Sequence, residues 1–480
     1  MNHVLRLPQA TQLYTLEQVE KLTMAEGLSL FKEFINPNLA QMYYLLGLAD
    51  RKPIKAEGLI ITMDDGTQVL DMTAGLAVLN VGHNHPRILA ARRKWADAKQ
   101  LEIWKFIPSP YQAALAHNIA QIMPGGLNKV FFCNSGAEAN EGALKLAQKY
   151  VGPERSITAF TDISFHGKTH ATLSVSGSEK HGNQHFKTMP DCAEIPYGDA
   201  DAFEALIAEH KKNFGKTRVG IFIVEAIRSE GLVTPPPGYF DRIQRLCKKH
   251  DIVLILDEVF CGFGRTGKMF AFEHQNVTPD IVSFSKAFGA GKASFGGYIA
   301  QDKLFNKAYG KLKHATLHST TYNGFGEEII TAIESLNIIQ DENLVERSAT
   351  MGKYLLERLQ QVQLKHPAIL KDVRGAGLLV NLELDNIASK IAKRVPVPIP
   401  DEVVSKLTTG GIITELYEKH NVLVYTPLHN HNLIMVSPSL TITKEQIDQF
   451  VEAVDQVLST NLVEKGLVYL KRMLNFSDAK

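Results

Sequence analysis

The sequence predicts an α/β fold, in which a mostly parallel sheet is flanked by helices and a smaller α+β domain lies beside it. Short apolar runs alternate with longer amphipathic stretches through the middle of the chain. Some of these runs, such as residues 252–256, are apolar throughout, which is typical of strands covered on both faces. The length of 480 residues exceeds what one hydrophobic core supports, so two or three domains are expected.

The elements of the middle region follow from these patterns. Helices are predicted over residues 136–150 and 238–250, where apolar residues recur with helical spacing. Strands are predicted at residues 130–133, 157–160, 219–224, 252–256, 281–284 and 297–300. In a parallel sheet of this kind, functional groups collect beyond the carboxyl ends of the strands.

The two flanks differ from the middle. Helical patterns cover residues 15–27 and 39–48 near one end, and 327–340 and 444–459 near the other. The proline-rich run 395–400 is predicted to be a surface insertion. We expect both termini to build the smaller domain. The predicted divisions are residues 1–80 for a helical extension and part of the small domain, 81–330 for the large domain, and 331–480 for the rest of the small domain.

The composition argues against several classes of protein. A hydrophobic fraction of 45% and a charged fraction of 21% are ordinary for a soluble globular protein. The 52 basic and 51 acidic residues nearly cancel, so no nucleic-acid partner is expected. The longest apolar stretches are far shorter than the roughly 20 residues of a membrane span. Four cysteines without paired spacing, and no long apolar run at the start, favour a cytoplasmic location.

A lysine and an acid follow two of the predicted strands. Asp257 ends the strand at 252–256, and Lys286 comes two residues after the strand at 281–284. An enzyme that uses pyridoxal phosphate needs such a pair: a lysine that holds the cofactor as a Schiff base and an aspartate that keeps its pyridine nitrogen protonated. The alternative is that both residues cap strand ends at the surface. Glu225 and two loop segments follow neighbouring strands, and this clustering favours an active site.

Two of these loops suit parts of a phosphorylated ring. Ser135 is predicted to cap the helix at 136–150 and Glu138 to reach back to it as a capping box, while Gly136 and Ala137 leave first-turn N–H groups uncovered. Such a helix start binds phosphate well, although a plain capped helix has the same pattern. Phe165 can stack on a planar ring or simply fill core space.

Other motifs are rejected. Gly262-Phe-Gly-Arg-Thr-Gly267 matches a dinucleotide or P-loop pattern only in part, because Met269 stands where a P-loop has Ser or Thr and no long helix follows. His83 and His85 lack accompanying ligands, so no metal site is predicted.

Together these segments resemble the class III, fold-type I pyridoxal-phosphate aminotransferases, the group that contains ornithine, acetylornithine, 4-aminobutyrate and putrescine aminotransferases. The resemblance covers residues 30–460. The motifs that carry it, in family order, are Asp71-Met-Thr-Ala-Gly75, Gly82-His-Asn-His-Pro86, Phe132-Cys-Asn-Ser-Gly-Ala-Glu-Ala139, Phe165-His-Gly-Lys-Thr169, Asp257-Glu-Val259, Gly264-Arg-Thr-Gly267, Ser285-Lys-Ala287, Thr320-Thr-Tyr322 and Val373-Arg-Gly-Ala-Gly-Leu378. The amino-terminal extension and Pro235-Pro-Pro-Gly-Tyr239 look most like putrescine aminotransferases.

The resemblance implies roles for residues of this chain. Lys286 would hold pyridoxal 5'-phosphate and move the substrate proton, and Asp257 would pair the pyridine nitrogen. Val259 and Phe165 would cover the two faces of the ring. The residues implied in phosphate binding are Ser135, Gly136, Ala137 and, from the neighbouring subunit of a homodimer or a dimer of dimers, Thr321. His166 and Glu225 are counted with the cofactor-binding residues, and Lys168 falls where relatives carry a cation that can meet a substrate carboxylate.

The chain departs from the family where substrate carboxylates bind. Relatives carry an arginine at the position of Met435, which grips a carboxylate or pairs with the glutamate matching Glu230. We hypothesise that Arg228, two residues before Glu230, supplies the missing cation or serves a different group of the substrate. The alternative is that Arg228 is a solvated or ion-paired surface residue.

The expected activity is a ping-pong transfer of an amino group from an amine or ω-amino donor to a keto acid or aldehyde. The donor is expected to be a diamine, an ornithine-like compound or a larger biosynthetic amine. Two alternatives stay open from the sequence: an epimerase or aminomutase on the same fold, and a non-catalytic protein that binds the cofactor.

Overall fold

The computed structural model describes residues 13–179, 184–211, 216–385, 401–427, 430, 432–460 and 472. The proline-rich run at 395–400 and the first eight residues, on which sequence predictions were made, lie outside these ranges. Among the described residues, no helix has the length and apolar character needed to cross a membrane.

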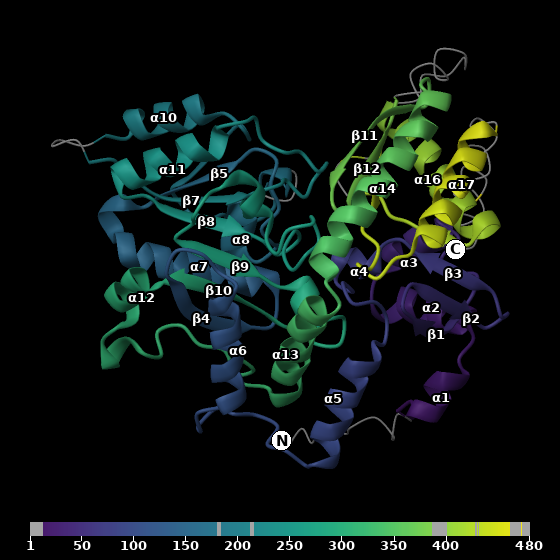
Figure 1. The fold of residues 1–480 in the computed structure, drawn as a ribbon, viewed down its shortest axis with the longest axis horizontal. Coiled ribbons are helices and arrows are strands. Elements are labelled where there is room, and N and C mark those ends of the chain that lie inside the picture. Colours follow the sequence, from purple (N-terminus) through teal and green to yellow (C-terminus); the bar gives the residue numbers. More distant parts are fainter. Residues whose placement is uncertain are drawn as a thin grey trace, which may run out of the picture.

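A seven-stranded sheet forms the centre of the larger lobe, at the left in Figure 1. In spatial order its strands are β4 (Leu127–Cys133), β10 (Gly296–Gln301), β9 (Ile281–Phe284), β8 (Val253–Asp257), β7 (Val219–Glu225), β5 (Ile157–Thr161) and β6 (Cys192–Ile195). The pairs from β9 to β6 are parallel, and β10 pairs antiparallel with both β9 and β4. The six predicted strands are therefore confirmed, while β6, a four-residue edge strand, was not predicted.

The continuous apolar character of the central strands arises because both faces of the sheet are covered. In β7, Ile221 and Ile223 pack in one hydrophobic cluster with residues of helix α7 (Gly136–Val151). The alternate residues Phe222 and Val224 pack on the opposite face, with residues of α11 (Tyr239–His250). Successive side chains of a strand point to opposite faces, so a strand between two helical layers is apolar at most of its positions. The remaining helices of this lobe include α6 (Pro110–Gln121), α8 (His170–Ser174), α10 (Ala200–Glu209), α12 (Asp302–Tyr309) and α13 (Gly326–Asp341).

The smaller lobe contains two further sheets, at the right in Figure 1. One joins β1 (Pro53–Glu57), β2 (Ile60–Met63) and β3 (Gln68–Asp71) to β13 (Val422–Leu423), so segments from both ends of the chain share a sheet. The other has the order β11 (Leu370–Ala376), β12 (Leu379–Leu384) and β14 (Leu433–Val436). Among the described residues, the helices outside the larger lobe are α1 (Leu16–Lys21), α2 (Met24–Phe34), α3 (Pro37–Leu45), α4 (Ala74–Ala77), α14 (Leu344–Lys365), α16 (Asp401–His420) and α17 (Lys444–Ser459). Helix α5 (Pro86–Asp97) packs against α13, since Arg87 and Arg92 bind Glu334 and Glu327. The domain boundaries proposed above stay predictions.

One predicted helix is two helices in the structure. The pattern at residues 15–27 spans α1 and the start of α2, because Thr23 begins a new helix. Its side chain caps the Glu26 N–H, and the Glu26 carboxylate accepts from the Thr23 N–H at 2.8 Å. Such a reciprocal cap starts a helix rather than continuing one.

Candidate active site

Lys286 begins a short 3₁₀ turn, η5 (Lys286–Gly289), directly after β9. Its backbone has φ of 43°, an uncommon value for a residue other than glycine. Its Nζ lies 4.3 Å from the centre of the Phe260 ring. Burial lowers the pKa of Lys286 to about 8, against the opposing effect of the nearby Asp257 carboxylate. The lysine is therefore far more often neutral near pH 7 than an ordinary lysine.

Asp257 ends β8 and is buried with both carboxylate oxygens engaged. Oδ2 lies 2.7 Å from His166 Nδ1 and accepts a hydrogen bond of 2.7 Å from Asn140 Nδ2. Oδ1 accepts from the Val259 N–H at 2.9 Å. The carboxylate is thus held in one orientation by three parts of the chain.

Glu225 ends the neighbouring strand β7, in register with Asp257. Its carboxylate accepts hydrogen bonds from the backbone N–H groups of Ser229, at 3.0 Å, and Phe165, at 3.3 Å. Burial raises the pKa of Glu225 to about 7. Glu225 therefore ties two loops to the strand end beside Asp257.

The amino terminus of α7 has the predicted cap with one difference. Ser135 Oγ accepts from the Glu138 N–H at 3.2 Å, as predicted. The Glu138 carboxylate accepts from the Asn134 N–H at 2.6 Å, one residue earlier than a capping box requires, and also from the Asn134 amide at 3.1 Å. The predicted capping box is therefore wrong in its second half, because the Asn134 side chain adds a second donor for the same carboxylate.

Two close approaches bring the surrounding loops to this helix start. A Cβ on Gly136 would lie 2.6 Å from Val259 Cγ1, so Val259, two residues after Asp257, leaves room only for glycine. A Cβ on Gly167 would lie 2.7 Å from that of Ala137, and Gly167 has φ of 133°. The loops that carry Val259 and Phe165 therefore both lie against the first turn of α7.

Phe165 and Lys168 lie exposed on the loop before α8. The Lys168 ammonium is 6.0 Å from the centre of the Phe165 ring. His166, by contrast, is buried, and its Nε2 has no hydrogen-bond partner among the described residues. Phe165 and Lys168 thus lie on the outer side of this loop, while His166 holds Asp257 from inside.

Thr321 lies exposed in the loop before α13. Its neighbour Thr320 contacts the site of its own chain, since Thr320 Oγ1 accepts from Asn134 Nδ2 at 3.3 Å. Nothing in a single chain tests the contact of Thr321 with a neighbouring subunit, which stays a prediction.

Arg228 is partly buried in the loop after β7, beside the Tyr197 ring at 5.8 Å from its centre. Its Nε donates to the Glu230 carbonyl oxygen at 2.7 Å, and among the described residues no carboxylate forms an ion pair with it. Burial lowers the pKa of Arg228, although a guanidinium stays charged at any ordinary pH. The residue is therefore a half-buried cation near Glu225 rather than an ion-paired surface group.

Met435 is buried in β14 and lies in a row of residues across the small sheet. Asn381 of β12 is its partner on one side, and Arg374 of β11 is the next residue along the row. This face of the sheet meets the loop that carries Arg228, because Arg374 Nε donates to the Gly231 carbonyl at 2.8 Å. The position of Met435, where the family resemblance implies an arginine, therefore lies on the face of the sheet that meets the Arg228 loop.

Three residues of the site were not found from the sequence. Asn140 fixes Asp257, and its only sequence signal is an asparagine on the apolar face of α7, one turn after Gly136. Arg374 and Asn381 are brought into line with Met435 only by the register of the paired strands, which the sequence does not show. Asn381 is 0% exposed, and neither its amide nitrogen nor its amide oxygen has a hydrogen-bond partner among the described residues.

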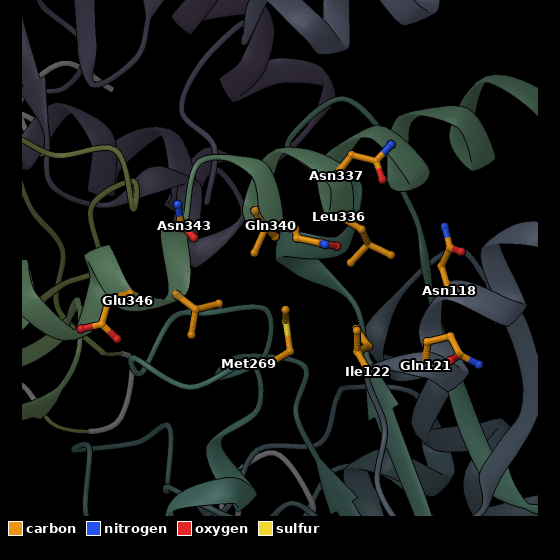
Figure 2. Close-up of a pocket in the computed structure, with 11 residues that line it drawn as sticks. Asn118, Gln121, Ile122, Met269, Leu336, Asn337, Gln340, Asn343 and Glu346 are labelled. Atoms are coloured by element: carbon orange, nitrogen blue, oxygen red, sulfur yellow. The ribbon is translucent and has the colours of Figure 1, made fainter.

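A cavity of about 680 Å³ lies away from these residues, between α6, α13 and the start of α14. Figure 2 shows carboxamide side chains of Asn118, Gln121 and Asn337 around it, with Met269 at its base. None of the candidate site residues lines it. Among the described residues, no group of three or more His, Cys, Asp or Glu side chains is arranged to hold a metal ion.

Comparison with known proteins agrees with this arrangement. The family model for class III aminotransferases matches residues 49–458. The chain belongs to this family. It is 31% identical over 480 residues, 93% of its length, to the aminotransferase PigE of a Serratia strain, and it spans 55% of the length of that relative.

Solved structures share the fold. An (S)-enantioselective ω-transaminase from Thermomicrobium roseum is 27% identical with a TM-score of 0.79, over 91% of this chain and 98% of that one. An ornithine aminotransferase from Toxoplasma gondii, with partial occupancy of pyridoxal phosphate at its active site, is 24% identical with a TM-score of 0.76, over 93% and 98% of the two chains. The fold is that of the fold-type I pyridoxal-phosphate transaminases, in agreement with the class III aminotransferase family to which the chain belongs.

Proposed function

We propose that this enzyme transfers the amino group of an amine or ω-amino donor to a keto acid or aldehyde, with Lys286 as the residue that holds the cofactor. The main support for the proposal is that Lys286 and the fixed carboxylate of Asp257 follow adjacent strands of the sheet. The pKa of this lysine is lowered to about 8. The Asp257 carboxylate is held by three separate groups, which a lysine and an aspartate that merely cap strand ends at the surface would not require.

The residues present fit pyridoxal 5'-phosphate. The uncapped N–H groups of Gly136 and Ala137 at the first turn of α7 suit its phosphate, as does the Ser135 hydroxyl. Val259 and the exposed ring of Phe165 flank the space where its pyridine ring would lie. When bound, the cofactor supplies an electron sink for the substrate's amine carbon.

Lys286 and Asp257 then have distinct tasks. A carboxylate facing the pyridine nitrogen favours the protonated ring, and the donors on Asp257 keep it in that position. A lysine that is neutral in a useful fraction of molecules can take the substrate proton and return it to another carbon. His166 and Glu225 act behind these two groups, by orienting Asp257 and the Phe165 loop.

We further propose a homodimer with shared active sites, in which Thr321 reaches the partner's phosphate. The loop that carries Thr321 runs beside a second loop, since the Trp104 N–H donates to the Gly324 carbonyl at 3.0 Å. Apolar side chains on these loops and nearby are strongly exposed, with Phe106 at 96% and Leu312 at 94%. Exposed apolar groups gathered beside an active site are typical of a subunit interface.

Arg228 is proposed to bind the carboxylate of the keto-acid acceptor, in place of the arginine that Met435 replaces. The support is its position after the end of β7, half-buried and without a carboxylate partner among the described residues. Replacing Arg228 with Ala should raise the apparent KM for keto acids at least tenfold and leave aldehyde acceptors unaffected. An unchanged KM for keto acids would contradict the role, whereas Lys168→Ala serves as a comparison for a second candidate cation.

The activity itself is tested by two half-reactions on the holoenzyme. An amine donor should remove the visible absorbance of the bound cofactor, and a keto acid or aldehyde added later should restore it. Parallel-line initial-rate plots should accompany this behaviour. Racemisation of an amino acid without any acceptor, and without loss of absorbance, would refute a transaminase in favour of an epimerase.

A further inference from the structure

Met435 lies next to a second cavity of the protein. The Met435 N–H donates to the Tyr425 carbonyl at 2.8 Å, and the two residues face each other across an isolated bridge. Tyr425 in turn lines a cavity of about 600 Å³. Met435 does not itself line the cavity, but it contacts a residue that does, so the position where the family resemblance implies a carboxylate-binding arginine lies one residue away from this space.

This cavity is apolar. Its walls come from α3, from the segment after β3, and from α16 and β13, with side chains that include Met42, Leu46, Leu76 and Ile413. Among the described residues that line it, none is charged. Leu76 is 50% exposed and Met42 39% exposed, so apolar groups reach the opening as well as the interior.

One stretch of chain joins the cavity to the neighbourhood of Lys286. Leu76 lines the cavity, and three residues later Leu79 packs against Gly291, where a Cβ would lie 2.1 Å from Leu79 Cδ2. Gly291 follows the 3₁₀ turn that Lys286 begins. The next residue, Asn80, donates to the Phe263 carbonyl at 2.7 Å, in the loop that follows Asp257. Residues 76–80 thus link the wall of the cavity to the loops that follow the two catalytic candidates.

We propose that this cavity holds the hydrocarbon part of the amino donor, which is an aliphatic amine with a chain of several carbons and no carboxylate beside the amino group. The inference rests on the proposed transaminase function and narrows its donor. Loss of the guanidinium at position 435 removes the grip on a donor carboxylate. In an uncharged cavity of this size, each methylene group removed from water makes binding more favourable, whereas burying a carboxylate there costs free energy.

The test is a series of straight-chain primary amines from propylamine to octylamine, each reacted with the holoenzyme. The second-order rate constant for loss of the cofactor absorbance should rise with chain length, by up to about fourfold per methylene. A rate constant that is flat or falls with chain length would overturn the proposal. Failure of every amine and amino acid tried to change the absorbance would instead refute the transaminase function.

Three variants locate the effect. Met42→Glu puts a charge at the opening and Leu46→Trp fills the interior, so both should flatten the dependence on chain length. Phe34→Glu is the matched control, because Phe34 is an exposed apolar residue of the neighbouring helix α2 that does not line the cavity. The control should keep the dependence of the unmodified protein. If Met42→Glu and Leu46→Trp keep it too, the chain binds elsewhere and the proposal is wrong.

Discussion

From the lowered pKa of Lys286 we predict how the rate at which the cofactor-free protein binds pyridoxal phosphate depends on pH. Only the neutral amine attacks the aldehyde, so the rate depends on the fraction of Lys286 that has lost its proton. With a pKa of about 8, that fraction at pH 7 is roughly 200-fold larger than for an ordinary lysine with a pKa of about 10.4. The rate constant should therefore rise about tenfold per pH unit up to pH 8 and level off above it.

The assay is stopped-flow absorbance of cofactor binding between pH 6 and pH 10, divided at each pH by the rate constant of a blocked lysine derivative expressed per neutral amine. This division removes the titration of the cofactor itself. Asp257→Asn should move the break to lower pH, because the carboxylate opposes the effect of burial on Lys286. A rate that climbs steadily to pH 10 without a break would refute the reasoning.

Three further predictions concern particular side chains. Gly136→Ala should weaken cofactor binding and destabilise the protein by about 1–3 kcal/mol through overpacking against Val259, and Val259→Ala should relieve both effects, as thermal melts and cofactor titration can show. Asn381→Leu should raise the stability by about 1–3 kcal/mol, because it removes a buried amide that has no partner in the described part of the chain; a lower melting temperature would contradict this. The pKa of Glu225 is raised in the folded state. Its favourable contribution to the free energy of unfolding is therefore present at acid pH and is lost as the pH rises toward 7. Glu225→Gln should remove this loss of stability, which is about 3 kcal/mol between pH 4.5 and 7. Denaturant melts of the variant and the unmodified protein across this range measure the free energy of unfolding. If the two plots of that free energy against pH run parallel, the prediction is wrong.

The elements that could be predicted from the sequence are those whose own residues define them. The strands β8 and β9 are mainly apolar, with Asp257 and Ser283 as the exceptions, because both faces of the sheet are covered. Helix α17 has a capping threonine and an apolar face, so each of the three elements was predicted to within about one residue. The strand β6 was not predicted because it is only four residues long and is partly exposed at the edge of the sheet. The antiparallel direction of β10 depends on its neighbours, which no local pattern reports.

The same limit applies to the site. Lys286 and Asp257 could be found because strand ends gather at one edge of a parallel sheet. The contact of Asn140 with Asp257 joins residues 117 positions apart, and the row of Arg374, Asn381 and Met435 exists only once three strands have paired in register. Residues that act through such pairing have no signature in a single sequence.

The role of Lys286 is tested most directly by reducing the holoenzyme with borohydride and mapping its peptides by mass spectrometry. We predict a pyridoxyl group on the peptide that contains Lys286. The adduct should be absent in Lys286→Ala and retained in Lys292→Ala, a matched change at an exposed lysine six residues later. An adduct on another lysine, or none at all in a protein that retains the cofactor, would contradict the account.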